Sequence, residues 1–175
     1  YNAALYVKSI KNEKNFDLSA LEIISPQVAK LIWLEDKYYV LIEYENLSDW
    51  NIKDPDEIKS IREKRDACYA ATVNAGYPQI EDPELHENIE ELFKWCEKNN
   101  IPVYGHIWIW VLHPHFNDDQ KDLMDEMYKL VQGLWWSVSG EHGIGKKKQK
   151  YLSEEETNQI KSIKQKWDSN DVFGF

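Results

Sequence analysis

The sequence predicts an α+β domain in which helices cover an antiparallel β-sheet. Short runs of β-branched, aliphatic and aromatic residues fill the first third of the chain, with turn residues between them. Amphipathic helical patterns dominate the rest, and strands and helices alternate irregularly rather than in the regular βα repeat of a parallel sheet. Some connections are also short enough for antiparallel pairing, so we expect an antiparallel sheet with the apolar helix faces packed on it.

The N-terminal part is expected to supply the first strands of this sheet. Strand propensity is high over Ala3–Ile10, Ala20–Ile24 and Tyr38–Glu45. Between the last two, Ser25 and Pro26 provide a cap and a first-turn proline for a short helix through Trp33.

Four longer helices are expected in the remainder of the chain, each beginning at a capping residue. The expected ranges are Asp54–Gly76, Asp82–Asn99, Asp118 or Asp119 to Leu134, and Ser153–Trp167. A proline follows the capping residue in the first two, and Ser153 forms a capping box with Glu156 in the last. Apolar residues recur at the helical period, so each helix is expected to bury one face; in the last helix this face is Ile160, Ile163 and Trp167.

One further strand is expected from Val103 to His113. It contains Ile107–Leu112, the most apolar stretch of the chain, which has strong strand propensity and no turn former. Residues seven positions apart in a straight strand lie about 23 Å apart and on opposite faces. We therefore expect His106 and His113 to be separated unless the backbone bulges between them. Trp108 and Trp110 are expected to face the core.

The composition is that of one folded, acidic domain. The chain has 175 residues, 42% of them hydrophobic and 13% aromatic, which is enough for a core of its own. Its 21 Lys and Arg against 31 Asp and Glu give a net charge of −10, which argues against a nucleic-acid binder. No apolar run approaches the roughly 20 residues of a transmembrane helix. Cys68 and Cys96 lie in separate predicted helices and are expected to be reduced core residues, which favours a cytoplasmic protein.

The segment Val138–Gly145 carries the residues best suited to chemistry. It lies between two predicted helices and places Glu141 and His142 among glycines, which let the backbone turn tightly and approach a ligand closely. An adjacent Glu and His can divide metal ligation and proton transfer between them. The order of the glycines is not that of a dinucleotide or phosphate-binding loop. The residues alone therefore leave open an ordinary glycine-rich turn with two solvated side chains.

The segment Ser139–Gly145 resembles the signature of the C-terminal domain of FAD-linked oxidases of the D-lactate dehydrogenase and glycolate oxidase type. Other segments resemble that family in order and spacing: Ala20–Glu22, Tyr39–Tyr44, Ile61–Arg65, Gly105 and His106 with His113, and Trp167–Asn170. The resemblance implies that residues 1–175 form this domain, with a ferredoxin-like antiparallel sheet that caps a flavin. The flavin-binding domain is implied to lie upstream or on a separate subunit. The chain begins with Tyr1 and shows no signal peptide, so we expect it to be a piece of a longer protein.

The resemblance also implies an activity and assigns residues to it. It implies oxidation of a lactate- or glycolate-like D-2-hydroxy acid to the 2-oxo acid, with hydride transfer to FAD. By position, His106, His113 and Glu141 would hold a divalent metal (Zn, Mn or Fe), His142 would take the hydroxyl proton, and Arg65 would bind the substrate carboxylate. Gly140, Gly143 and Gly145 are implied to lie against the cofactor. The expected partners are the small hydroxy acid and the flavin-binding domain, with a homo-oligomer and peripheral membrane association left open.

Several positions allow other interpretations. His113 and His115 are two residues apart and would share a face of an extended segment, although we expect His115 to be an exposed loop residue. Arg62 competes with Arg65 for the substrate carboxylate. The basic run Lys146–Lys150 is expected to be a solvated loop. After Asp168 the sequence departs from the family pattern, so no flavin contact is expected there.

Two other functions remain open at this point. The first alternative is a non-catalytic relative that acts as a binding or subunit-contact module. The second is a metal-free oxidase of a bulkier substrate. The binding module would use an interface built from tryptophans, because this residue is enriched in binding hot spots. The tryptophans expected there are Trp108, Trp110, Trp135 and Trp136.

Overall fold

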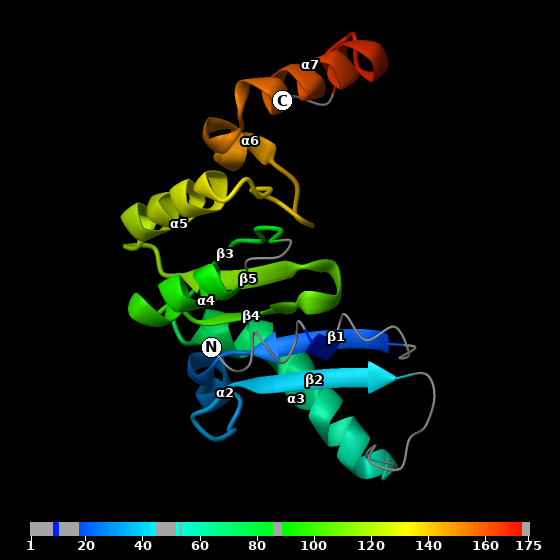
Figure 1. Cartoon of the computed structure of the whole chain (residues 1–175), viewed down its shortest axis with the longest axis vertical. Coiled ribbons are helices and arrows are strands. Elements are labelled where there is room, and N and C mark those ends of the chain that lie inside the picture. Colours follow the sequence, from blue (N-terminus) through cyan, green and yellow to red (C-terminus); the bar gives the residue numbers. More distant parts are fainter. Residues whose placement is uncertain (1–8, 11–17, 45–51, 53, 86–88, 173–175) are drawn as a thin grey trace.

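The computed structural model describes residues 9–10, 18–44, 52, 54–85 and 89–172. Its centre is a five-stranded sheet with the order β2-β1-β4-β5-β3, in which every described pairing is antiparallel (Figure 1). The strands are β1 (Leu18–Ile24), β2 (Tyr39–Tyr44), β3 (Gln79–Ile80), β4 (Val103–His106) and β5 (Val111–Phe116). The predicted α+β class with an antiparallel, helix-covered sheet is therefore confirmed. The strand expected over Ala3–Ile10 lies outside the described residues except for Ser9 and Ile10, which are helical.

The single strand expected from Val103 to His113 is wrong, because the chain turns back on itself there. Residues Ile107–Ile109 form a 3₁₀ turn, and Trp110 follows in the left-handed region with a φ of 62°. The turn contains no turn-forming residue. It is instead stabilised by tertiary packing, because its first residue, Ile107, and Leu112 in the strand that follows are completely buried. Gly105 permits the close approach of the two strands, since a Cβ there would clash with the carbonyl oxygen of Val111.

Three of the long helices form largely as expected. They are α3 (Pro55–Asn74), α5 (Lys121–Gly133) and α7 (Glu154–Trp167), with the short α2 (Pro26–Leu31) between the first two strands. Asp54 caps α3 by accepting from the backbone N–H groups of Asp56 and Glu57. The predicted capping box between Ser153 and Glu156 is also present.

The helix expected from Asp82 begins later in the chain. Helix α4 spans Ile89–Lys98, whereas residues 81–85 run along the sheet, where the backbone N–H of Leu85 donates to the carbonyl oxygen of Trp110. The Asp82–Pro83 pair is thus not a helix start, because its backbone is used by the sheet and by the loop around residue 140. The basic run expected as a loop forms α6 (Gly145–Lys148) and the 3₁₀ turn η2 (Gln149–Tyr151).

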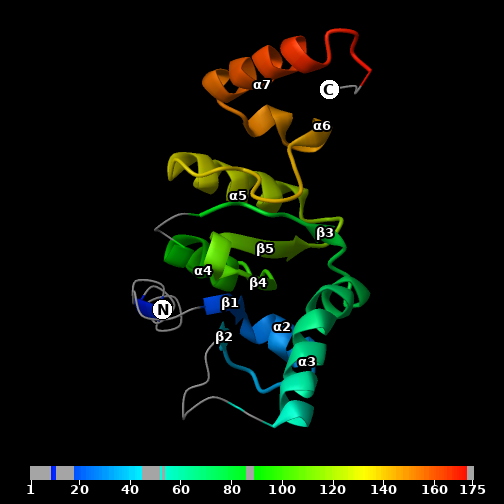
Figure 2. The ribbon, with the colours of Figure 1, turned by 90° about the vertical axis from the view of Figure 1, so that its right-hand side faces the viewer.

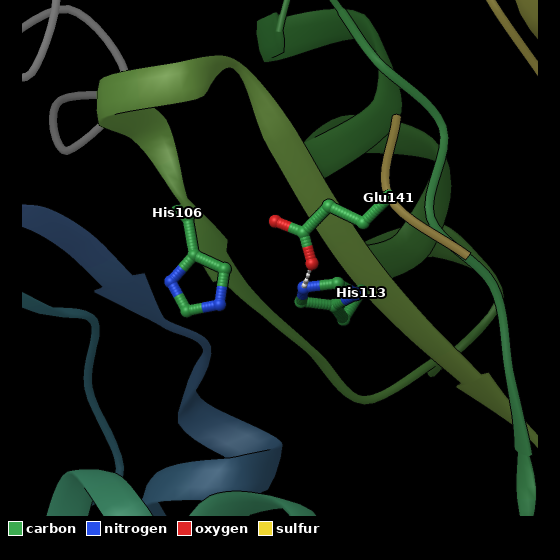
Figure 3. A group of neighbouring side chains, drawn as sticks. All are labelled: His106, His113 and Glu141. Carbon is green, nitrogen blue, oxygen red and sulfur yellow. Dashed lines mark ion pairs between the residues drawn. The ribbon is translucent and has the colours of Figure 1, made fainter. Parts of the chain in front are cut away.

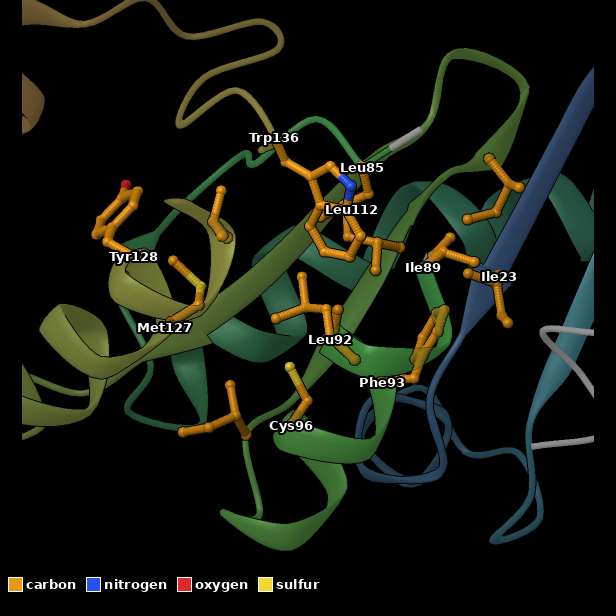
Figure 4. Packing of buried hydrophobic residues seen from close by; sticks show 14 of the residues in the cluster. Ile23, Leu85, Ile89, Leu92, Phe93, Cys96, Leu112, Met127, Tyr128 and Trp136 are labelled. Carbon is orange, nitrogen blue, oxygen red and sulfur yellow. The ribbon is translucent and has the colours of Figure 1, made fainter. Parts of the chain in front are cut away.

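Helices cover both faces of the sheet, with α3 on one side and α4 on the other (Figure 2). The main core lies between the sheet and α4 and α5, where Leu92, Phe93 and Met127 pack against Ile23 and Leu112 (Figure 4). A smaller core beneath α2 and α3 contains Val28, Ile32 and Cys68. Cys68 and Cys96 are both buried free thiols, as expected.

The expected inner face of the last helix is not buried. Among the described residues of α7 none is buried, and Ile163 and Trp167 are largely exposed. Figure 1 shows the reason, since α6 and α7 lie beyond α5, away from the sheet. Within the described part of the chain, no helix combines the length and apolar character needed to cross a bilayer.

Candidate metal and substrate site

The face of the sheet toward α3 carries an unusual set of polar side chains. Side chains alternate along a strand, so Val103 and Leu112 enter the main core while their neighbours point to the opposite face. The strand register then brings these neighbours into line, because His106 pairs with Glu22 on β1 and Tyr104 pairs with His113 on β5. The β4–β5 hairpin therefore places both histidines on one face of adjacent strands.

His106, His113 and Glu141 form the central cluster (Figure 3). Each offers one possible ligand atom, and these three atoms all lie within 4.8 Å of one another. The Nε2 atom of His113 lies 3.7 Å from a carboxylate oxygen of Glu141, and the two imidazole rings have centroids 5.2 Å apart. The two strands of one hairpin and a loop about 30 residues further along the chain thus meet at one point. The separation expected from a straight strand does not occur, because the hairpin turn lies between the two histidines.

Each histidine of this cluster has a second partner behind it. The Nδ1 atom of His113 lies 3.4 Å from the backbone carbonyl oxygen of Glu81, and the Nδ1 atom of His106 lies 3.4 Å from the carboxylate of Glu22. Such contacts fix the tautomer and ring orientation of histidines that bind metals through the other nitrogen. In both residues Nδ1 is engaged, which leaves Nε2 as the ligand atom.

The pKa values of His106 and His113 are shifted in opposite directions. Burial, together with the neighbouring His106 and His142, lowers the pKa of His113 to about 4, so this ring is neutral near pH 7. The hydrogen bond to Glu22 raises the pKa of His106 above its ordinary value, although burial opposes the shift. A neutral imidazole is the form that binds a metal.

Asp82 organises the loop that carries Glu141 and His142. Its carboxylate is fully buried, and one oxygen, Oδ2, accepts from the backbone N–H of Glu141 at 2.7 Å and of His142 at 2.6 Å. The same oxygen accepts from the hydroxyl of Ser139 at 2.9 Å. The buried ammonium of Lys148 donates to the other oxygen, Oδ1. Burial alone would raise the pKa of Asp82, but these donors hold it below its usual value.

His142 lies beside the cluster without belonging to it. Its ring stacks on that of His113 with a centroid distance of 5.4 Å, and its Nδ1 atom lies 3.6 Å from Oδ1 of Asp82. The side chain is 43% exposed. It lines an open cavity of about 470 Å³ together with the three cluster residues and with Tyr69, Ile80 and Tyr104.

Arg65 lies in an adjoining cavity. This second cavity has a volume of about 330 Å³ and shares Tyr69, Tyr104 and His106 with the first. The guanidinium is already paired, at 2.9 Å from Asp66, 3.6 Å from Glu43 and 3.8 Å from Glu22. The competing Arg62 is bound to Glu43 at 3.1 Å and does not line either cavity. Of the two arginines, Arg65 is therefore the one placed near the cluster.

The local backbone explains why glycine occupies each of the three motif positions, Gly140, Gly143 and Gly145. A Cβ at Gly140 would clash with the side chain of Val111, and Gly143 and Gly145 adopt left-handed φ angles of 74° and 50°. These facts explain the tight course of the loop. Contact of the glycines with a flavin stays a prediction.

Other sequence expectations for the site need correction. His115 is fully buried rather than exposed, and its Nδ1 lies 3.1 Å from the carbonyl oxygen of Tyr77, so it is not part of the described cluster. The basic run is not simply solvated, because Lys148 is buried against Asp82. Trp108 does not face the core, since it is 45% exposed, whereas Trp110 packs against it.

The sequence did not reveal the roles of Glu81, Asp82 and Lys148. Glu81 is buried and accepts from the hydroxyl of Tyr128 and the ammonium of Lys147. An acidic pair before a proline predicts a helix start, and a lysine run predicts a solvated face. The one signal in the sequence was that the Glu81–Asp82 pair and the lysine run carry opposite charges. This signal does not show that the two segments, more than 60 residues apart, pair with each other and become buried.

Comparison with known families gives one relevant match. A family model described as "FAD linked oxidases, C-terminal domain" matches residues 53–174, which is well over half of the chain. The matched range includes Arg65, the β4–β5 hairpin and the Glu141–His142 loop. A search of the curated proteins returned no match.

Proposed function

Because the chain belongs to the family of FAD-linked oxidase C-terminal domains, we propose that it forms the substrate side of a flavin-dependent 2-hydroxy-acid oxidoreductase. The family identifies the chain as a domain of a flavin-dependent oxidoreductase. The proposed substrate is a D-2-hydroxy acid of the lactate or glycolate kind, and the proposed product is the 2-oxo acid. The flavin would be bound mainly by another domain of the same protein or by a separate subunit.

The observation that carries this proposal is the cluster of His106, His113 and Glu141. Two imidazoles and one carboxylate within 4.8 Å suit a catalytic divalent ion such as Zn, Mn or Fe, with coordination positions left for substrate. The contacts of both Nδ1 atoms to Glu81 and Glu22 support a site prepared for ligation. A divalent ion held here would polarise the hydroxyl oxygen of the substrate and favour loss of its proton.

His142 is the proposed base. Its Nδ1 faces Asp82, so Nε2 is the nitrogen available to the cavity. Oxidation of the 2-hydroxy acid releases its hydroxyl proton, which Nε2 of His142 would take. A flavin, when bound, would supply the two-electron acceptor for the C2 hydride, which leaves the 2-oxo acid. The nearby Asp82 carboxylate stabilises the imidazolium that His142 becomes.

Arg65 is the proposed partner of the substrate carboxylate. The wall shared by the two cavities, formed by Tyr69, Tyr104 and His106, lies between Arg65 and the cluster. A small hydroxy acid that spans this wall would place its hydroxyl near the cluster and its carboxylate near the guanidinium. Asp66 makes the shortest contact with Arg65, at 2.9 Å, but it is also the most exposed of the three acids, at 66%, so it is the partner that a substrate carboxylate would replace.

A non-catalytic binding module remains the second candidate function. It is favoured by the exposed Trp135, of which 94% is accessible, and by the half-exposed Trp108. Trp110 and Trp136 pack into the core instead, so the four tryptophans do not form one exposed surface.

Flavin reduction in the complete, flavin-loaded enzyme tests the proposal. D-lactate or glycolate should bleach the visible absorption of the flavin, L-lactate should do so far more slowly, and metal analysis should give one divalent ion per chain. His142→Asn should slow this reduction by about 10²-fold or more, with an unchanged metal content. Reduction at the normal rate in His142→Asn would exclude His142 as the base. Reduction by no 2-hydroxy acid would overturn the proposal and leave a binding module or an oxidase of a bulkier substrate.

A further inference from the structure

The loop that carries Glu141 and His142 is attached to one buried carboxylate. Four hydrogen bonds join residues 139–142 to Asp82, because its backbone carbonyl also accepts from the N–H of Gly140 at 2.7 Å. We propose that Asp82 is the positioning residue for both Glu141 and His142, and that Lys148 holds Asp82 in place. This inference deepens the proposed function, on which the roles of Glu141 and His142 rest.

The geometry explains how one residue can direct two side chains. The N–H groups of Glu141 and His142 are consecutive, and both point at the same oxygen atom, Oδ2. Consecutive N–H groups converge on one anion only when the backbone between them is tightly curved. That curvature sends the Glu141 side chain toward His113, at 3.7 Å, and stacks the His142 ring on His113. Without the hydrogen bonds to Asp82, the loop would lose the orientations of the Glu141 and His142 side chains together.

Lys148 makes the anchor possible. The carboxylate of Asp82 is fully inaccessible, and an unpaired buried carboxylate takes up a proton and loses acceptor strength. The ammonium of Lys148 donates to Oδ1 and also lies 3.2 Å from the hydroxyl of Ser139, itself part of the loop. Oδ2 thereby stays free to accept three donors from the loop. The carboxylates paired with Lys148 are those of Asp82 and, at 3.7 Å, Glu81, so its effect on Glu141 and His142 passes through Asp82.

Asp82 also orients the His142 ring. Its Oδ1 atom lies 3.6 Å from Nδ1 of His142, while the ring remains 43% exposed toward the cavity. This arrangement favours the tautomer with the proton on Nδ1 and the lone pair on Nε2. The carboxylate therefore fixes both the place of the base and the nitrogen that takes the proton.

The chain contains a matched control for this network. Lys147 and Lys148 are neighbours on α6, and both ammonium groups pair with buried acids, but Lys147 binds Glu81 and Gln79 and does not reach Asp82. Lys148→Met and Lys147→Met each remove one positive charge from the same helix. Only the first removes the partner of Asp82.

The test uses the full 175-residue chain and two measurements. Calorimetric titration with Mn²⁺ reports the affinity of the cluster, and amide hydrogen exchange reports the anchoring of the Glu141 and His142 backbone. We expect Asp82→Ala and Lys148→Met to lower Mn²⁺ affinity by about 10- to 100-fold and to speed exchange of both amides. Lys147→Met should change neither, and Lys148→Arg should restore most of the affinity. Thermal melting verifies that each variant is folded.

The two measurements separate this inference from the proposed function. If the wild-type chain binds no Mn²⁺, Zn²⁺ or Fe²⁺, the proposed metal site is wrong. Hydrogen exchange at the amides of Glu141 and His142 still decides the role of Asp82. If Lys148→Met exchanges these amides as slowly as Lys147→Met does, the inference is overturned. Should Asp82→Ala not fold, the near-isosteric Asp82→Asn takes its place, with the ¹⁵N shifts of the His142 ring as the readout. An unaltered Nδ1-protonated tautomer in Asp82→Asn would likewise overturn it.

Discussion

His106 and His113 face each other across the β4–β5 hairpin, with their rings nearly perpendicular at 76° and their centroids 5.2 Å apart. Because His106 pairs with Val111 and His113 with Tyr104, the two imidazoles lie diagonally across adjacent strands on one face of the sheet. A slip of this register by one residue would move one ring to the opposite face.

Gly105 should be essential to the hairpin. Gly105→Ala places a Cβ against the carbonyl oxygen of Val111 and the side chain of Leu112, and should lower the free energy of unfolding by about 1–3 kcal/mol. Urea denaturation measures this loss, and metal affinity should fall with it. Gly133→Ala is the matched control, because a Cβ at the end of α5 meets no atom and should be neutral or slightly stabilising. Equal stability of the two variants would contradict this account of the turn.

Glu141 should contribute directly to metal binding. Glu141→Gln removes the only carboxylate of the cluster while nearly preserving its shape, and should weaken Mn²⁺ binding by at least about 10-fold. The exposed Glu126 on α5 supplies the control, since Glu126→Gln removes the same charge away from the cluster. Isothermal calorimetry after treatment with a chelator is the measurement. An equally small loss of Mn²⁺ affinity in both variants would indicate that Glu141 acts only through the net charge of the protein and is not a ligand.

Arg65 should affect substrate binding more than turnover. In the flavin-loaded enzyme, Arg65→Met is expected to raise KM for the hydroxy acid by roughly 10- to 100-fold, the value of one charge-assisted hydrogen bond, with a smaller effect on kcat. Arg62→Met serves as the comparison, because that side chain is paired with Glu43 outside both cavities. Steady-state kinetics decide between them, and a larger KM effect from Arg62→Met would reverse the assignment.

The metal-free chain should lose stability as the pH falls through the range set by His113. The folded imidazole has a pKa of about 4, against an ordinary value of 6.5, so the unfolded state binds the proton first. Stability is therefore retained above about pH 6.5 and lost, by up to about 1.4 kcal/mol per pH unit, as the pH falls toward 4. Urea unfolding with a chelator present measures this slope. His113→Gln should flatten it, and an unchanged slope would exclude His113 as the cause.

Local sequence was enough for much of the fold. Asp54 with Pro55 and Ser153 with Glu156 define helix starts through contacts within one turn, and these predictions were confirmed. The glycines around Glu141 and His142 drew attention to these two residues, but the residues alone left an ordinary turn open, and their roles came from the resemblance to the family.

The hairpin and the buried network could not be predicted because they depend on long-range contacts. Nothing between Ile107 and Trp110 favours a turn, and the turn exists because Ile107 and Leu112 fill the core from both sides. Asp82 has the sequence context of a helix cap, yet its partners are Glu141, His142 and Lys148, about 60 residues away. Propensity and periodicity do not report such partners.

The cluster and the residues that support it come from parts of the chain that are far apart in sequence, from Glu22 on β1 to Lys148 on α6. An ion that binds only this assembled arrangement is thermodynamically linked to global folding, and at 100 times its dissociation constant it would add about 2.7 kcal/mol of stability. Metal supply would then set the cellular lifetime of the protein as well as its activity, because the metal-free chain unfolds more often and is exposed to proteolysis.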